Sequence, residues 1–105
     1  MWIFTSKGFV SIVNDYERPG NLLCRARAKK HLEELFPGET ITTTPKRDYR
    51  FRVSVPREVA VRIIANQVEN ITYNNFKNSI PEHDYHEACS DVWGVMYKYQ
   101  REQIV

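Results

Sequence analysis

Residues 49–55, Tyr-Arg-Phe-Arg-Val-Ser-Val, alternate apolar and polar side chains and decide the fold class. Such period-two alternation is typical of a strand with one face buried and the other open. We therefore predict that Tyr49, Phe51, Val53 and Val55 face helices, and that Arg50, Arg52 and Ser54 face away from them.

The elements on the N-terminal side of this strand read as a hairpin, a loop, a strand and a helix. Residues 2–5 and 9–14 are rich in β-formers and are joined by a short glycine-containing turn. Residues 15–21 are dense in turn formers, and residues 22–28 alternate with Cys24 and Ala26 on one face and Arg25 and Arg27 on the other. Helical spacing begins at residue 29 and stops at Pro37.

On the C-terminal side, the pattern predicts two helices separated by an ambiguous segment. Pro56 ends the strand and suits the first turn of a helix that continues to residue 69. Residues 71–76 fit either an edge strand or an irregular segment. Ser79 and Glu82 have capping-box spacing, and the apolar residues from Tyr85 to Tyr99 then recur at helical steps, which predicts a long helix with a buried apolar face.

These elements predict an α+β fold in a single domain covering residues 1–105. The order strand, helix, hairpin, helix over residues 22–69 is the core order of a ferredoxin-like, split β-α-β antiparallel sheet. To this core the chain adds an N-terminal hairpin and a long C-terminal helix. In that topology the strands at 22–28 and 49–55 are neighbours.

Charge is unevenly distributed along the chain, although the formal net charge is only +2. Residues 25–62 hold ten Lys or Arg against five acids, and residues 63–105 hold three bases against six acids. With the two strands adjacent, the arginines gather on one sheet face, which predicts an anion-binding surface for nucleic acid or an acidic protein. The candidate residues are Arg25, Arg27, Arg50 and Arg52, with Lys46 and Arg47 at the rim.

A competing interpretation is that the acidic last helix, with Glu82, Asp84, Glu87 and Asp91, neutralises the basic face within the chain. Nucleic-acid-binding modules usually also expose aromatic side chains between their basic residues, whereas the aromatic residues of this strand are predicted to lie in the core.

A second candidate region lies between residues 73 and 86. Tyr73, Asn75, Lys77, His83 and His86 bring polar groups together, which leaves a small enzyme site open as an alternative. Two histidines three residues apart do not make a zinc site without a third ligand, so we expect no metal and no cofactor. His31 is alone on its helix and is predicted to be a surface residue.

The two cysteines, Cys24 and Cys89, have no metal or redox spacing and are predicted to be buried hydrophobes. No apolar run approaches the length that spans a bilayer, and the first residues do not read as a secretory signal. We expect a soluble, cytoplasmic protein without a membrane partner.

Several short motifs carry a resemblance over nearly the whole chain: Met1-Trp2-Ile3-Phe4-Thr5, Arg25-Ala26-Arg27, Tyr73 followed by Asn75-Phe76-Lys77, and Val92-Trp93. With these motifs the chain resembles a family of small bacterial and phage proteins. The resemblance carries no activity with it, and it implies only that these residues belong to family motifs.

The sequence thus predicts a non-enzymatic binding or regulatory module that engages an anionic partner, either nucleic acid or a nucleoprotein. The enzyme site, a phage or prophage accessory inhibitor, and a homodimer through Trp93, Met96 and Tyr99 of the last helix are the alternatives.

Overall fold

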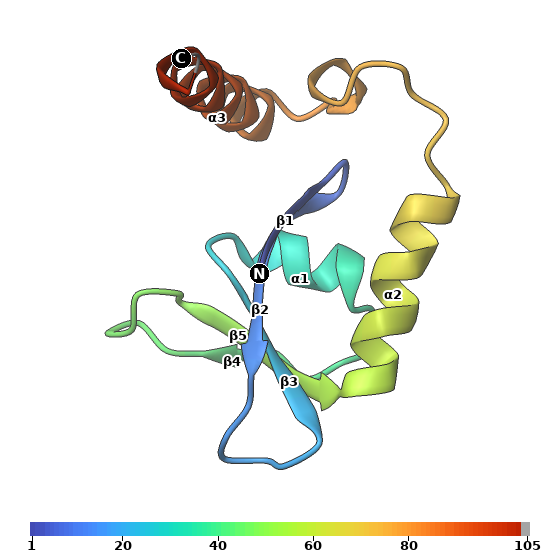
Figure 1. Cartoon of the computed structure of the whole chain (residues 1–105). Coiled ribbons are helices and arrows are strands. Elements are labelled where there is room, and N and C mark those ends of the chain that lie inside the picture. The colour runs from blue at the N-terminus through green and yellow to red at the C-terminus, as the bar shows by residue number, and fades with distance from the viewer. Residues whose placement is uncertain (104–105) are drawn as a thin grey trace. The chain divides into compact units, whose positions relative to one another are not determined.

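The computed structural model describes residues 1–103 as an α+β fold with a five-stranded antiparallel sheet and three α-helices. The chain divides into two compact units, Met1–Thr72 and Tyr73–Val105, each of which is described by itself. The prediction of a single domain therefore stays a prediction. Figure 1 shows the sheet, with α1 and α2 beside it, in the first unit.

The first unit contains all five strands. They are β1 (Trp2–Thr5), β2 (Gly8–Asn14), β3 (Asn21–Ala26), β4 (Thr42–Thr43) and β5 (Phe51–Pro56), with α1 (Lys29–Leu35) after β3 and α2 (Arg57–Glu69) after β5. Their order in the sheet is β1-β2-β3-β5-β4, and all pairs are antiparallel. The predicted adjacency of β3 and β5 is therefore confirmed.

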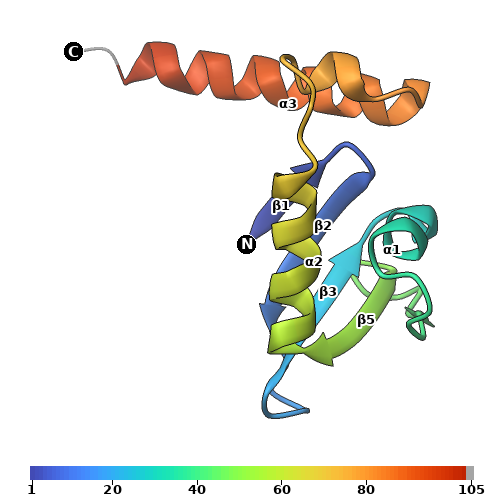
Figure 2. The same cartoon turned by 90° about the vertical axis from the view of Figure 1, so that its right-hand side faces the viewer.

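Both helices of this unit contact the same face of the sheet, and the core lies between them and the strands (Figure 2). As the alternation predicts, Cys24, Ala26, Val53 and Val55 are buried in it. Val10 and Ile12 of β2 join them from the sheet, and Leu32, Leu35, Phe36 and Ala60 close the core from the helical side.

A ferredoxin-like sheet would place a further strand, supplied after α2, beside β3. Here β2 pairs with that edge of β3, and residues 71–76 form no strand. The ambiguous segment is thus irregular. The arrangement of the described residues establishes an α+β fold with an antiparallel sheet.

Two predicted positions in the first unit are wrong. Tyr49 does not face the helices, because β5 begins at Phe51 and the alternation does not extend back into the turn that precedes it. Its ring lies instead against the guanidinium groups of Arg25 and Arg27. His31 is not a surface residue: it is buried, and its Nδ1 accepts a 3.2 Å hydrogen bond from the Phe9 N–H.

The second unit consists of a 3₁₀ turn, η1 (Lys77–Ser79), and α3 (His83–Glu102). The predicted start of this helix at Ser79 is wrong. Glu82 is the N-cap, and its carboxylate accepts hydrogen bonds from the N–H groups of Asp84 and Tyr85. The long C-terminal helix itself is confirmed.

The prediction that the apolar face of α3 is buried throughout is also wrong. Tyr85 and Cys89, in its first half, are buried, whereas Val92, Trp93, Met96 and Tyr99 are exposed. The residues that precede α3 in this unit, 73–82, are too few to cover a helix of this length. Among residues 1–103, no helix combines the length and apolar character needed to cross a bilayer.

Candidate anion-binding surface

The sheet face opposite α1 and α2, called here the open face, carries a continuous cross-strand row. Trp2 is the partner of Ser11, Ser11 of Arg25, Arg25 of Arg52, and Arg52 of Thr42. Because directly opposed residues project from the same side of a sheet, this row runs across all five strands on one face. Arg25 and Arg52 stand at its centre.

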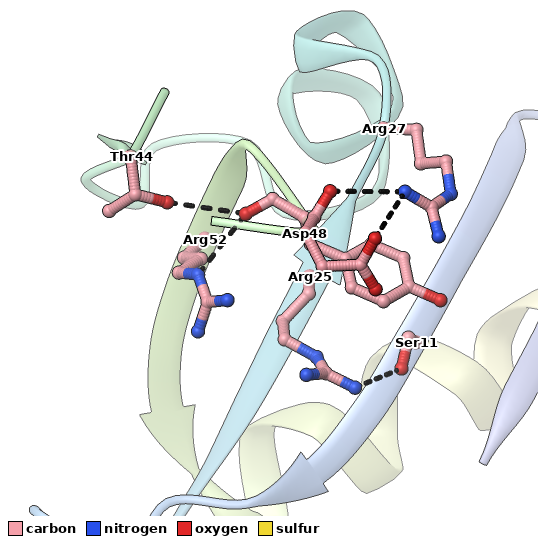
Figure 3. A network of polar contacts seen from close by, with 7 residues as sticks. Ser11, Arg25, Arg27, Thr44, Asp48 and Arg52 are labelled. Atoms are coloured by element: carbon pink, nitrogen blue, oxygen red, sulfur yellow. Dashed lines mark hydrogen bonds and ion pairs between the residues drawn. The ribbon is translucent and has the colours of Figure 1, made fainter. Parts of the chain in front are cut away.

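Arg25 is held on the open face by its neighbours (Figure 3). Its Nη2 donates a 2.9 Å hydrogen bond to Oγ of Ser11, and its guanidinium lies 4.5 Å from the centre of the Tyr49 ring. Its Nε is buried and has no hydrogen-bond partner among the described residues. The guanidinium is therefore partly shielded from water and fixed in position.

Arg27 also contacts the Tyr49 ring. Its guanidinium lies 4.2 Å from the ring centre, and Nη1 contacts both the main-chain oxygen of Asp48, at 3.0 Å, and its carboxylate, at 3.3 Å. Tyr49 is consequently only 3% exposed although it lies outside the hydrophobic core. The ring spaces the two arginines and holds them on the open face.

Arg52 is held by a main-chain contact. Its Nε donates to the main-chain oxygen of Tyr49 at 3.2 Å, and no carboxylate bonds to its side chain in the part of the chain that the structure describes. Burial, together with the positive charges of Arg25 and Arg47, lowers the pKa of the Arg52 guanidinium. Arg52 still carries its charge at neutral pH, since an arginine pKa starts so high.

A shallow hollow of about 680 Å³ opens over this part of the sheet. Val13, Leu23, Arg25, Arg52 and Ser54 contribute from the strands of the open face. The rim comes from the β2–β3 loop and from the chain between α1 and β5, and it includes Asp15, Glu17, Arg18, Glu39 and Arg47. The hollow thus mixes both signs of charge at its rim and has Arg25 and Arg52 on its floor.

Asp15 is buried at this rim and is held by the sheet. The Ser54 hydroxyl donates a 2.6 Å hydrogen bond to Oδ2, and the Glu17 N–H donates to Oδ1 at 3.1 Å. The Ser54 hydrogen bond is the main reason that the pKa of Asp15 is lowered. Asn21 in turn donates to the Ser54 hydroxyl, so the β2–β3 loop is anchored to β5.

The six residues predicted to bind anions are therefore not equivalent. Arg25, Arg52 and Arg47 line one hollow, and Arg27 joins them through Tyr49. Lys46 and Arg50 are exposed and do not line it. Sequence reasoning did not assign Tyr49 or Ser11 to this surface and treated Asp15 as a loop residue. Tyr49 alone, with Arg47 and Arg50 near it in the chain, gave a signal in the sequence.

The polar residues of the second candidate region take part in local contacts. Asn75 accepts a hydrogen bond from the Asn78 N–H, and Lys77 Nζ lies 5.2 Å from the Trp93 ring centre. Tyr73 contacts Phe76, and His86 Nδ1 lies 3.9 Å from Glu87. His83 is exposed. Within residues 1–103 no cluster of three or more His, Cys, Asp or Glu is arranged to hold a metal.

The cysteines are buried, as predicted. Burial raises the pKa of the Cys24 thiol to about 12, and burial also raises the pKa of Cys89. Neither thiol is therefore activated as a nucleophile.

Comparison of the chain with protein-family models, with curated proteins and with solved structures gave no match.

Proposed function

We propose that residues 1–72 form a binding module for a polyanion, with Arg25 and Arg52 as the central contacts. The observation that carries this proposal is that two guanidinium groups oppose each other on neighbouring strands without a carboxylate bonded to either side chain among the described residues. Such a pair destabilises the sheet, and a bound phosphate or carboxylate would relieve the repulsion. No observation in the described residues favours the enzyme alternative at 73–86.

The proposal is tested by retention on immobilised heparin between about 50 and 200 mM salt, a range over which phosphate-type contacts weaken strongly. We expect the wild type to be retained at low salt and the Arg25→Glu, Arg52→Glu variant to pass through. A matched control, Arg57→Glu with Arg62→Glu, makes the same charge change on α2 and should largely keep retention. The Gln version of the test pair guards against loss of folding, which circular dichroism checks.

Retention that is equal in the open-face variant and the α2 control would mean that net charge alone drives binding, and the proposal would fail. Absence of wild-type retention at low salt would also refute it. If the polyanion belongs to a nucleoprotein, the protein could act as a phage or prophage inhibitor of that nucleoprotein. The resemblance to small bacterial and phage proteins does not indicate which polyanion is bound.

As a second proposal, α3 forms a homodimer. Val92, Met96 and Tyr99, which are exposed, recur at steps of four and three, the spacing of a helix–helix seam. The acids Asp84, Glu87 and Asp91 lie in the first half of α3, whereas the second half holds Lys98 and Arg101 with a single acid, Glu102. Two antiparallel copies would place opposite charges together, which favours a second copy as the partner.

Sedimentation equilibrium tests the dimer. We expect a concentration-dependent dimer in the wild type and a monomer after Met96→Glu, while Val61→Glu, on exposed α2, should not change the mass. A wild type that stays monomeric at high concentration would exclude the dimer.

Finally, we propose that residues 21–69 are related to the ferredoxin-like fold. The chain order β3, α1, β4, β5, α2, with β5 between β3 and β4 in the sheet, supports this relationship. An experimental structure of a relative with a strand in place of β2 would test it.

A further inference from the structure

The open face carries aromatic side chains as well as arginines. Trp2 is the cross-strand partner of Ser11, and Phe4 is the partner of Phe9, two residues along β2 on the same side. Their rings form one cluster: Trp2 and Phe9 meet edge to face at 6.1 Å, and Phe4 and Phe9 stack at 4.4 Å between ring centres. Because this row continues through Ser11 to Arg25, the aromatic cluster and the arginines share one surface.

Cross-strand aromatic pairs also stabilise hairpins, and that role accounts for Phe4 and for the one face of the Phe9 ring that stacks on it, both residues being half-buried. It does not account well for Trp2, whose side chain is 71% exposed. A large indole that remains mostly in water gains little from the hydrophobic effect. Trp2 therefore offers a free ring surface at the edge of the cluster.

The spacing of the row suits an extended polymer. From β1 through β2 and β3 to β5 there are three inter-strand steps of about 4.8 Å each, so the rings on β1 and β2 lie within roughly 14 Å of the guanidinium groups on β3 and β5. Arg25 and Arg52 supply charge-assisted donors for phosphate oxygens, and Ser11 stands between the arginines and Trp2. Ring surfaces for bases beside donors for phosphates are what an unpaired nucleic-acid strand requires.

We propose that the open face binds single-stranded nucleic acid, with bases stacked on Trp2 and Phe9 and the phosphate backbone on Arg25 and Arg52. This inference rests on the polyanion binding proposed above and narrows the ligand. A duplex is disfavoured because its base faces are stacked on each other and do not reach the rings. An acidic protein would use the arginines and leave the aromatic cluster without a role.

The test uses a fluorescein-labelled oligothymidylate and the full chain in a Trp93→Phe background, so that Trp2 is the remaining tryptophan. We expect the oligonucleotide to quench Trp2 emission as it binds. Fluorescence anisotropy should show that Trp2→Leu weakens binding about 5- to 150-fold, the loss of one stacking contact. A Phe9→Leu variant should weaken it similarly. Heparin retention should be unchanged in both, because no charge is altered.

The matched control is Val61→Ala on α2, an exposed apolar residue on the helical side, which should bind as tightly as its parent. Since Trp2 is exposed, Trp2→Leu is expected to fold, and the urea midpoint confirms that. The Arg25→Gln, Arg52→Gln variant should lower the slope of log affinity against log salt by about 1.4, from two phosphate contacts on a single strand.

Three results would overturn the inference, and they separate base stacking from anion binding. Equal affinity for the oligonucleotide with and without Trp2 and Phe9, or equal affinity for duplex and single strand, would refute base stacking while polyanion binding stands. Loss of heparin retention in the wild type itself would refute the underlying anion binding, and single-strand binding with it.

Discussion

Arg25 and Arg52 are direct cross-strand partners in β3 and β5, with Tyr49 supporting both: its ring lies against the Arg25 guanidinium, and its main-chain oxygen accepts from Arg52. Like charges at such positions destabilise a sheet, and the described residues contribute no carboxylate bonded to either side chain. The charges of Arg25 and Arg52 therefore repel each other at the centre of the open face.

The first prediction concerns the salt dependence of stability. Salt screens the repulsion between Arg25 and Arg52, so adding salt should stabilise the wild type more than Arg52→Gln, by about 0.2–1 kcal/mol. Urea denaturation at low and high sodium chloride measures the difference. An identical salt response in both proteins would show that the pair does not repel appreciably.

The second prediction concerns the ring between the arginines. Replacing Tyr49 with Leu removes two cation–π contacts and should cost about 1–2 kcal/mol of unfolding free energy. It should also lower the salt concentration of heparin elution, because Arg25 and Arg27 lose their support. Tyr49→Phe keeps the ring and serves as the control. If Leu and Phe variants behave alike, the ring does not position the arginines.

The third prediction concerns the contact between Gly8 and the buried His31. A Cβ at position 8 would collide with Cγ and Cβ of His31, which lie at the base of that side chain rather than at a flexible end. Gly8→Ala should therefore destabilise the protein by about 1–3 kcal/mol. Gly94→Ala has nothing within 4 Å of the added Cβ and should stabilise α3 by about 0.5–1 kcal/mol. Thermal unfolding compares the two, and a neutral Gly8→Ala would contradict the packing.

The fourth prediction follows from the lowered pKa of Asp15. A depressed folded-state pKa contributes stability above the usual value of 3.8, and this contribution is lost as the pH falls through the lower folded value. Ser54→Ala should raise the Asp15 pKa, measured by NMR titration of the side chain. The stability gap between wild type and Ser54→Ala should be largest at neutral pH and narrow in acid.

Part of that gap should persist in acid, because Asn21 also donates to Ser54 and does not titrate. Asp15→Asn supplies the control, since without the carboxylate the effect of Ser54→Ala should no longer depend on pH. A gap that is independent of pH in the wild-type background would exclude the Asp15 mechanism.

Local pattern was enough to predict an antiparallel α+β fold and the direction of the side chains in its central strands, but not the full order of the sheet. Alternation within β3 and β5 correctly placed Cys24 and Val53 in the core, and it placed Arg25 and Arg52 on the opposite face, because period two is a property of the strand itself. It failed at Tyr49, which precedes the strand, where a turn directs the side chain.

The remaining errors involve contacts between distant parts of the chain. His31 is buried because Gly8 leaves room for it and the Phe9 N–H bonds to it, and neither relationship is visible in the spacing of a short helix. The aromatic cluster was missed for a similar reason. Trp2 lies in the same cross-strand row as the arginines only because of three successive pairings, β1–β2, β2–β3 and β3–β5. In α3, periodicity predicted which residues share a face but not what covers it.

The strand order also bears on how fast the protein folds. The pairs β1–β2, β2–β3 and β4–β5 join consecutive strands, whereas β3–β5 must close a loop that contains α1 and β4. Closing long loops is the slow part of forming antiparallel sheets. The transition state is thus expected to contain the β3–β5 pairing, the same event that brings Arg25 opposite Arg52. Charge repulsion between these arginines would then slow folding, and a polyanion present during folding would reduce the repulsion and speed folding.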